Sequence, residues 1–201
     1  MSEDLDFLPT SVQIYMMFIK TYMEYDLQTF EEVASKKGFD GKLGVAMITN
    51  ACAAMNVVGW LFHQKFSNPV GDGKLFEYLL ADERFFQKGE LAFKPLYQLV
   101  RCGVVHQYYP KSMNIAINPA SNEIYGQVWN KPVVNAIAFY RRIFKVVMKA
   151  DSIIQNLSQE SLRDFDLKLL LRQRMDLEDA EAADFKIANL PVFSEGHVIQ
   201  Q

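Results

Sequence analysis

The stretch that organises the predicted fold is Ala92–Lys111, AFKPLYQLVRCGVVHQYYPK. Pro95 fits a first helical turn, where its missing N–H costs nothing, and Pro110 ends the helix because the residue before a proline disfavours the α conformation. Arg101 and His106 interrupt an otherwise apolar helix, where burying a charge is costly unless the group is paired or functional. The apolar residues recur at the spacing of one helix face and predict a place in the core: Leu96, Leu99, Val100, Gly103 and Val104.

The composition fits one globular domain. The chain has 201 residues, of which 50% are hydrophobic and 22% charged, enough to bury one substantial core. Its 15 Phe, 9 Tyr and 9 Met residues predict an aromatic-rich core, or such a core together with an oligomer interface. Because the net charge is −3, no overall positive field attracts nucleic acid, and that partner would need a local basic patch.

Cysteine usage and the N-terminal sequence favour the cytoplasm. Cys52 and Cys102 both lie in apolar stretches and are expected to be small buried thiols. Two cysteines without a secretory context do not make a disulfide framework. The first ten residues, MSEDLDFLPT, are acidic and polar, which argues against a signal or transit peptide. We therefore expect a reduced, cytoplasmic protein.

Hydrophobic periodicity predicts a mainly α, single-domain helical bundle of five to seven helices. Residues 1–181 form the helical domain, and residues 182–201, which lose the periodicity, form a C-terminal arm. The first helix is expected to start at Thr10 or Ser11 and end near Tyr25, with Asp26 capping a second, short helix. Further helices are expected over these approximate ranges: 43–62, 74–81, 95–109, 132–157 and 162–181.

One small β-hairpin is predicted near 113–129. Two stretches alternate as strands, Met113–Ile117 and Ile124–Trp129, on either side of turn-forming residues. Pro132 is then expected to open the long helix that follows. The basic residues of that helix lie mainly away from its apolar side: Arg141, Arg142, Lys145 and Lys149.

The stretch Leu43–Phe62 has no charged residue and is about as long as a membrane span. We favour the central helix of a bundle, because Thr49, Asn50 and Asn56 are costly in lipid and aromatic belts are lacking. No membrane partner is therefore expected. His63 follows this helix and is expected at the surface or as a helix cap.

The segment LVRCGVVHQYYPK, Leu99–Lys111, resembles the Arg-x4–6-His signature of the HEPN superfamily, the higher eukaryotes and prokaryotes nucleotide-binding domains. The all-helical layout is similar to that family's bundle. Members commonly dimerise, and many are metal-independent ribonucleases that act as toxins or in phage defence. The resemblance implies a HEPN-like metal-independent endoribonuclease that acts on RNA, forms a homodimer and has an antitoxin-type protein partner.

The resemblance assigns catalysis to Arg101 and His106. Five positions along an α-helix do not place two side chains on one face, so we expect two copies to meet and line a single cleft with both pairs. The residues expected to bind substrate are Cys102, where the family often has asparagine, together with Tyr108, Tyr109 and Lys111.

The chemistry can be written from the side chains themselves. Cleavage of RNA through its own 2′-hydroxyl needs a base, an acid and positive charge on the phosphorane. Histidine titrates in the range that proton transfer requires, and the planar guanidinium of arginine matches phosphate oxygens. Either tyrosine ring can stack on a splayed base. No cofactor or metal is expected, because the histidines and cysteines show no ligand-type spacing.

A structural interpretation stands beside this one. Arg101 can pair with a buried carboxylate such as Glu77 or Asp82, and His106 can cap the C-terminal end of its helix. The chain would then be a catalytically silent interaction or dimerisation module. Neighbouring carboxylates such as Glu31 and Glu32 are expected on a solvated helix surface.

Overall fold

The computed structural model describes residues 11–36, 42–65, 69–91 and 114–182. The described chain is mainly helical and carries a small sheet, which confirms the predicted fold class. Its elements in order are α1 (Val12–Ala34), α2 (Lys42–His63), α3 (Asp72–Ala81), β1 (Asn114–Ala116), β2 (Tyr125–Val128), β3 (Lys131–Asn135), α5 (Ala136–Gln155) and α6 (Gln159–Ala182).

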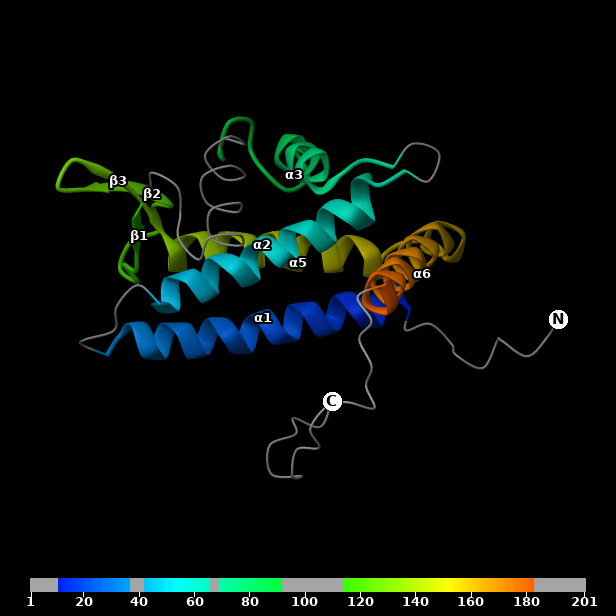
Figure 1. Cartoon of the computed structure of the whole chain (residues 1–201), viewed down its shortest axis with the longest axis horizontal. Helices are drawn as coiled ribbons and strands as arrows, with labels where there is room; N and C mark the ends of the chain where they lie inside the picture. The colour runs from blue at the N-terminus through cyan, green and yellow to red at the C-terminus, as the bar shows by residue number, and fades with distance from the viewer. Residues whose placement is uncertain (1–10, 37–41, 66–68, 92–113, 183–201) are drawn as a thin grey trace, which may run out of the picture.

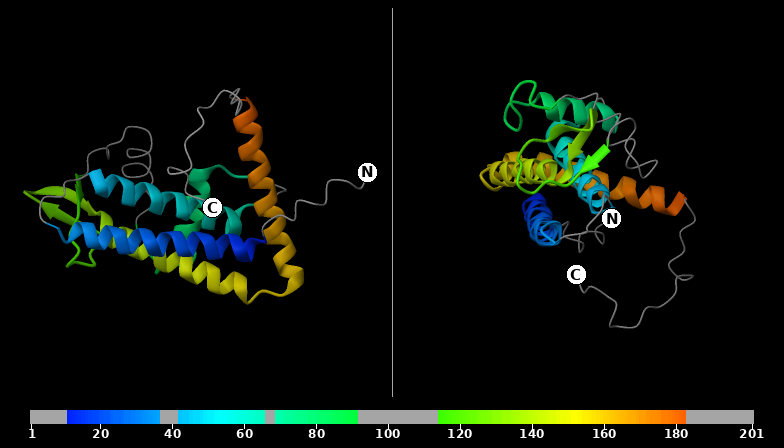
Figure 2. Two further views of the ribbon diagram at one scale, coloured as in Figure 1. Left: turned by 90° about the horizontal axis from the view of Figure 1, so that it is seen from below. Right: turned by 90° about the vertical axis from the view of Figure 1, so that its left-hand side faces the viewer.

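Helix α5 is the centre of the bundle. It packs against both α1 and α2, which make few contacts with each other. Figures 1 and 2 show these three helices running along one another, with α6 crossing one end and the sheet at the other. Helix α5 is central because its sequence is amphipathic. Its apolar residues recur at helical spacing and are buried: Ile137, Tyr140, Ile143, Val147 and Ile154.

Helix α1 is longer than predicted. Its N-cap is Ser11, as expected, and the Ser11 hydroxyl accepts from the Ile14 N–H at 3.4 Å. The break predicted at Asp26 is wrong, because α1 continues to Ala34. The Asp26 carboxylate does not cap a new helix but accepts hydrogen bonds from Asn50 of α2 and Tyr140 of α5.

Helix α2 is a packed helix of the bundle, as predicted, but the central position belongs to α5; α2 lies between α5 and α3. It is the one helix in the described ranges that is long and apolar enough to cross a membrane, and 56% of its apolar window is buried inside the structure. Cys52 is buried within it, as expected of a small thiol. At Gly59 an added Cβ would lie 3.2 Å from the Leu75 carbonyl oxygen of α3, so the missing side chain allows the two helices a close approach.

The sheet is built differently from the predicted hairpin. Its strand order is β1-β3-β2, with β1 parallel and β2 antiparallel to β3, so the two stretches expected to pair with each other do not. The actual hairpin joins β2 to β3 through Trp129 and Asn130, whose positive φ angles of 49° and 59° suit a type I′ turn. Pro132 lies in β3 rather than at the start of a helix.

A buried asparagine fastens the sheet to the bundle. Asn135 ends β3 and precedes α5, and only 5% of it is exposed. Its side chain accepts from the Asn118 N–H at 3.0 Å and donates to the carbonyl oxygens of Asn118 and Ser121. These bonds satisfy its polar atoms and fix the loop before β2 against the first turn of α5.

Helix α6 crosses the end of the bundle. The Val12 N–H at the start of α1 donates to Asp166 at 2.7 Å, and the Trp60 indole donates to the Lys168 carbonyl at 3.0 Å. The helix extends to Ala182, and the remainder of the arm expected over 182–201 lies outside the described residues.

Candidate functional site

All six predicted site residues lie in the segment 92–113, outside the described residues: Arg101, Cys102, His106, Tyr108, Tyr109 and Lys111. The described chain reaches this segment at Leu91 and resumes at Asn114. Leu91 is buried and lines a surface cleft.

The cleft lies where the sheet meets α5 and has a volume of about 350 Å³. Its walls carry three cationic and two carboxylate side chains. The lining residues that decide its charge are Glu90, Glu123, Arg141, Arg142 and Lys145.

Arg142 is held firmly in this cleft. Its guanidinium is paired with Glu90 through two hydrogen bonds, donates to the Phe85 carbonyl at 2.6 Å, and lies 4.7 Å from the centre of the Phe86 ring. The hydrogen bonds from Arg142 hold the pKa of Glu90 below its ordinary value although burial opposes this. Because Glu90 compensates its charge, Arg142 contributes shape and rigidity more than free positive charge.

Arg141 is also neutralised. Its Nε lies 2.8 Å from a Glu31 carboxylate oxygen, and its Nη1 donates to the Pro119 carbonyl at 2.9 Å. Glu31 therefore links α1 to α5 while its side chain stays 42% exposed, and Glu32 lies at the solvated surface as predicted, 71% exposed. Lys145 is exposed and has no ion pair among the described residues, so it is the cation of this cleft that is available to an anionic ligand.

Tyr125 also lines the cleft. Its hydroxyl is buried and has no hydrogen-bond partner among the described residues. Burial raises the pKa of Tyr125 to about 12, so the hydroxyl stays protonated at neutral pH and can act as a donor.

A second polar cluster lies at the end of α2. The His63 Nε2 atom is 3.3 Å from an Asp82 carboxylate oxygen, and Arg84 binds the same carboxylate at 2.5 Å. His63 ends α2, as a capping residue would, but only 17% of its side chain is exposed. Burial is the main cause that lowers the pKa of His63, and the charges of Arg84 and Lys168 act in the same direction. The neutral ring serves packing at this helix end.

Asp82 stays ionised in this cluster. Burial alone would raise the pKa of Asp82, but the hydrogen bonds and charge of Arg84 outweigh it and hold the pKa below its ordinary value. Glu77 likewise has a cationic partner, because its carboxylate lies 2.6 Å from the Lys74 ammonium group. The two carboxylates suggested as partners for Arg101 therefore both have cationic partners within the described chain.

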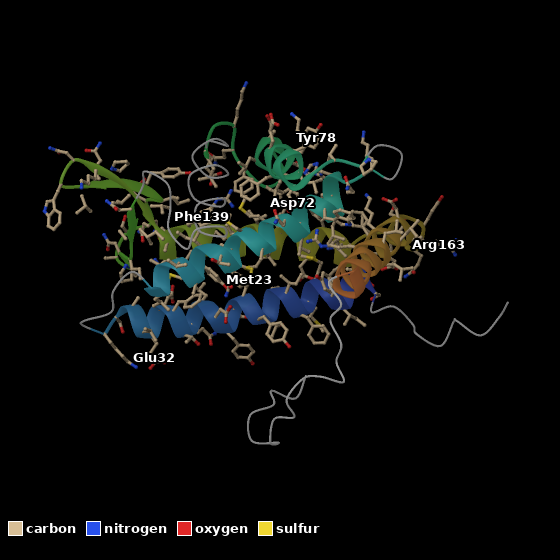
Figure 3. All side chains as sticks on the ribbon, in the orientation of Figure 1. Met23, Glu32, Asp72, Tyr78, Phe139 and Arg163 are labelled. Carbon is tan, nitrogen blue, oxygen red and sulfur yellow. The ribbon has the colours of Figure 1, made fainter. Side chains whose placement is uncertain are left out.

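An apolar groove of about 240 Å³ runs between α1 and α2 above α5. Met23, which Figure 3 labels between the two helices, lies in its floor. Small residues of α2 keep the groove open, and rings of α1 border it. Its main lining residues are Tyr15, Ile19, Tyr22, Ala53, Ala54 and Val57.

Sequence reasoning missed the cleft. Arg141, Arg142 and Lys145 were expected only on the outer faces of a helix, but their i, i+1, i+4 spacing puts three cations on its first half, beside the sheet. That spacing was a usable signal. Their partners Glu31 and Glu90 were not predictable, because they lie 110 and 52 residues away in the chain.

Neither a metal centre nor a relative marks a site. No group of three metal-ligating side chains occurs within residues 11–36, 42–65, 69–91 and 114–182. In comparisons with protein families, with curated proteins and with solved structures, nothing matches this chain.

Proposed function

We propose that this chain is a HEPN-like metal-independent endoribonuclease of the cytoplasm, in which Arg101 and His106 from two copies line one cleft. The observation that carries the proposal is the Arg-x4-His pair in an apolar stretch, followed at once by Tyr108-Tyr109-Pro110-Lys111. The mainly helical body supports it, because the resemblance implies a helical bundle. The cleft supports it as well, since Leu91, the last described residue before this segment in the chain, lines the same cleft as the cation Lys145.

The chemistry assigns one role to each side chain. His106 takes the proton of the ribose 2′-hydroxyl, whose oxygen attacks the adjacent phosphorus. Arg101 stabilises the negative charge that develops on the phosphoryl oxygens. The P–O5′ bond breaks, and a protonated imidazole, supplied by the second copy, gives its proton to the leaving oxygen. The products are a 2′,3′-cyclic phosphate and a 5′-hydroxyl. One proton is removed and one is donated, so the step needs no other reactant.

The test is cleavage of a fluorescently labelled single-stranded RNA by the purified full-length protein in EDTA. His106→Ala removes the proton-transfer group and is expected to abolish cleavage, and Arg101→Ala is expected to reduce it by about 10²–10³-fold. His63→Gln is a matched control, because His63 packs at a helix end and should keep cleavage. Unchanged activity in His106→Ala, or an inactive wild-type chain, contradicts the proposal.

A second candidate is a catalytically silent helical interaction or dimerisation module in which Arg101 and His106 are structural. One observation favours it: the cleft's two arginines are already neutralised, while apolar side chains of α1 are exposed. In this case wild-type protein leaves RNA intact, and His106→Ala or Arg101→Ala lowers the melting temperature or dissociates the dimer.

A further inference from the structure

The face of α1 that points away from the bundle is exposed and largely apolar. Figure 3 shows its side chains along the edge of α1 opposite to α2. Among its exposed positions from residue 14 to residue 29, Glu24, which lies seven residues after Met17, is the one that carries a charge. Its large side chains are 44–65% exposed: Ile14, Met17, Phe18, Tyr22 and Tyr25. We refer to these five residues as the outward face of α1.

Three of the five charged residues of α1 are turned the other way. Lys20 pairs with Asp151 of α5 at 2.6 Å, and Asp26 and Glu31 also bond to residues of α2 or α5. A helix whose outer face stays in water usually places its charged side chains on that face and its aromatic rings toward the core. The reversed arrangement is typical of a helix that is covered on both sides.

The polar atoms between these side chains are already satisfied. The hydroxyl of Thr21 donates to the Met17 carbonyl at 2.9 Å, and that of Thr29 donates to the Tyr25 carbonyl at 2.9 Å. Covering a hydroxyl costs little when its hydrogen bond lies within its own helix. The outward face of α1 can therefore lose its water without leaving these two donors unpaired.

We propose that the outward face of α1 binds α1 of a second copy of this chain in antiparallel orientation. Ile14, Phe18, Thr21 and Tyr25 follow one another at steps of four, three and four residues, the spacing of a helix–helix seam. The pattern is symmetric about a point between Ile19 and Lys20. Antiparallel pairing about that point places Ile14 opposite Tyr25 of the second copy, twice, and Phe18 opposite the small Thr21, twice.

The available area is sufficient for such a contact. The three rings are 47%, 57% and 65% exposed, which leaves about 340 Å² of ring surface per copy if each side chain presents about 200 Å². Ile14 and Met17 bring this to about 500 Å² per copy, or about 1,000 Å² in total, the lower limit of a specific interface.

The charges of α1 argue against a membrane as the occupant. Helices that lie on anionic lipid carry Lys and Arg beside their apolar face. The sole basic residue of α1 is Lys20, which Asp151 neutralises, and the exposed ionisable residues nearby are Glu24 and Glu32. An apolar, self-complementary face without a basic residue fits a second copy better.

This inference does not depend on whether Arg101 and His106 act on RNA, and its test measures association rather than cleavage. Tyr25→Glu places a carboxylate in the proposed seam and is expected to weaken association at least about 30-fold, as for an interface hot spot. Light scattering on the full-length chain should then show half the native mass. Met148→Glu is the matched control, because Met148 is 48% exposed on α5 and outside the seam, so its mass should stay native.

Cysteine pairs test the orientation. Ile14→Cys and Tyr25→Cys chains, each also carrying Cys102→Ser, should form a disulfide-linked dimer when mixed and oxidised. Neither chain should do so alone, because only the mixed pair brings residues 14 and 25 together.

Each result decides the proposal. A monomeric wild-type chain, a Tyr25→Glu variant of native mass, or equal cross-linking of the separate and mixed cysteine chains overturns it. So does a wild-type monomer that binds vesicles of phosphatidylcholine and phosphatidylserine through Tyr25. A monomeric wild-type chain would also contradict the two-copy cleft of the ribonuclease proposal. The other outcomes leave that proposal standing, because it is tested by the cleavage assay with wild type and His106→Ala.

Discussion

Gly44→Ala tests the contact that holds the sheet on the bundle. Gly44 is buried near the start of α2, and an added Cβ would lie 2.4 Å from the Cγ2 atom of Ile115 in β1. Replacing glycine by alanine within a helix favours folding by about 1 kcal/mol, whereas overpacking a core costs about 1–3 kcal/mol. The Cγ2 atom is attached to a stiff, β-branched Cβ, so the clash should win. We expect a net loss of about 1 kcal/mol, or about 2–4 °C in melting temperature.

A second substitution identifies the cause of that loss. Ile115→Leu keeps the volume but removes the methyl group that meets the new Cβ, and alone it should cost less than about 1.5 kcal/mol. In the double variant Gly44→Ala should become stabilising by about 1 kcal/mol, a coupling that a double-mutant cycle in urea measures directly.

Gly126→Ala provides the control for the sheet. Its Cβ would lie 3.6 Å from Val133, an ordinary contact, so stability should be unchanged or slightly raised. If Gly44→Ala alone raises stability, β1 does not pack on α2 in the way described.

Two further predictions concern buried ionisable groups. The pKa of His63 in the folded chain lies below its ordinary value of 6.5, so the unfolded chain binds a proton at His63 more readily. The contribution of His63 to the free energy of unfolding should therefore be fully present above pH 6.5 and should fall as the pH drops below that value. Urea midpoints at about pH 7.5 and about pH 5.5 should therefore differ more in wild type than in His63→Gln, and equal differences would refute this. Lys20→Met leaves the 5%-exposed Asp151 without its cation and should cost about 3 kcal/mol. Asp151→Leu should cost less, because Lys20 is one-third exposed and can reach water; urea unfolding that gives the opposite order contradicts the assigned burial.

The fold class was predictable because helical periodicity dominates the chain. The apolar positions of α5 follow the helix period along its length, and Ser11 caps α1 as its sequence indicates. The continuation of α1 through Asp26 was not predictable, because the Asp26 carboxylate, expected to cap a new helix, instead bonds to Asn50 and Tyr140 of other helices. Local capping preference carries no information about such partners.

Pro132 shows a second limit of local patterns. Proline is favoured in the first turn of a helix, yet this one lies in β3, the middle strand of the sheet. The pairing of β1 with β3 starts only at Val133, so the missing N–H of Pro132 costs no hydrogen bond to β1. Only the register, which arises from residues far apart in the chain, reveals that the position tolerates proline.

The site was predictable in residue type but not in charge balance. Sequence shows that Arg141 and Arg142 are cations on one helix, but not that Glu31 and Glu90 neutralise them. Lys145, which has no such partner among the described residues, was indistinguishable from them in the sequence. The roles of Arg101 and His106 stay predictions that the cleavage assay addresses.

The central place of α5 has a consequence for biosynthesis. The main packing partner of α1 lies more than a hundred residues downstream, and ribosomes add about 5–20 residues per second. Helix α1 therefore leaves the ribosome roughly 5–25 s before the surface it packs on, with both its inner and its outer apolar sides facing solvent. During that interval the nascent chain is a natural client for chaperones, and slowing translation between residues 90 and 136 would lengthen its dependence on them.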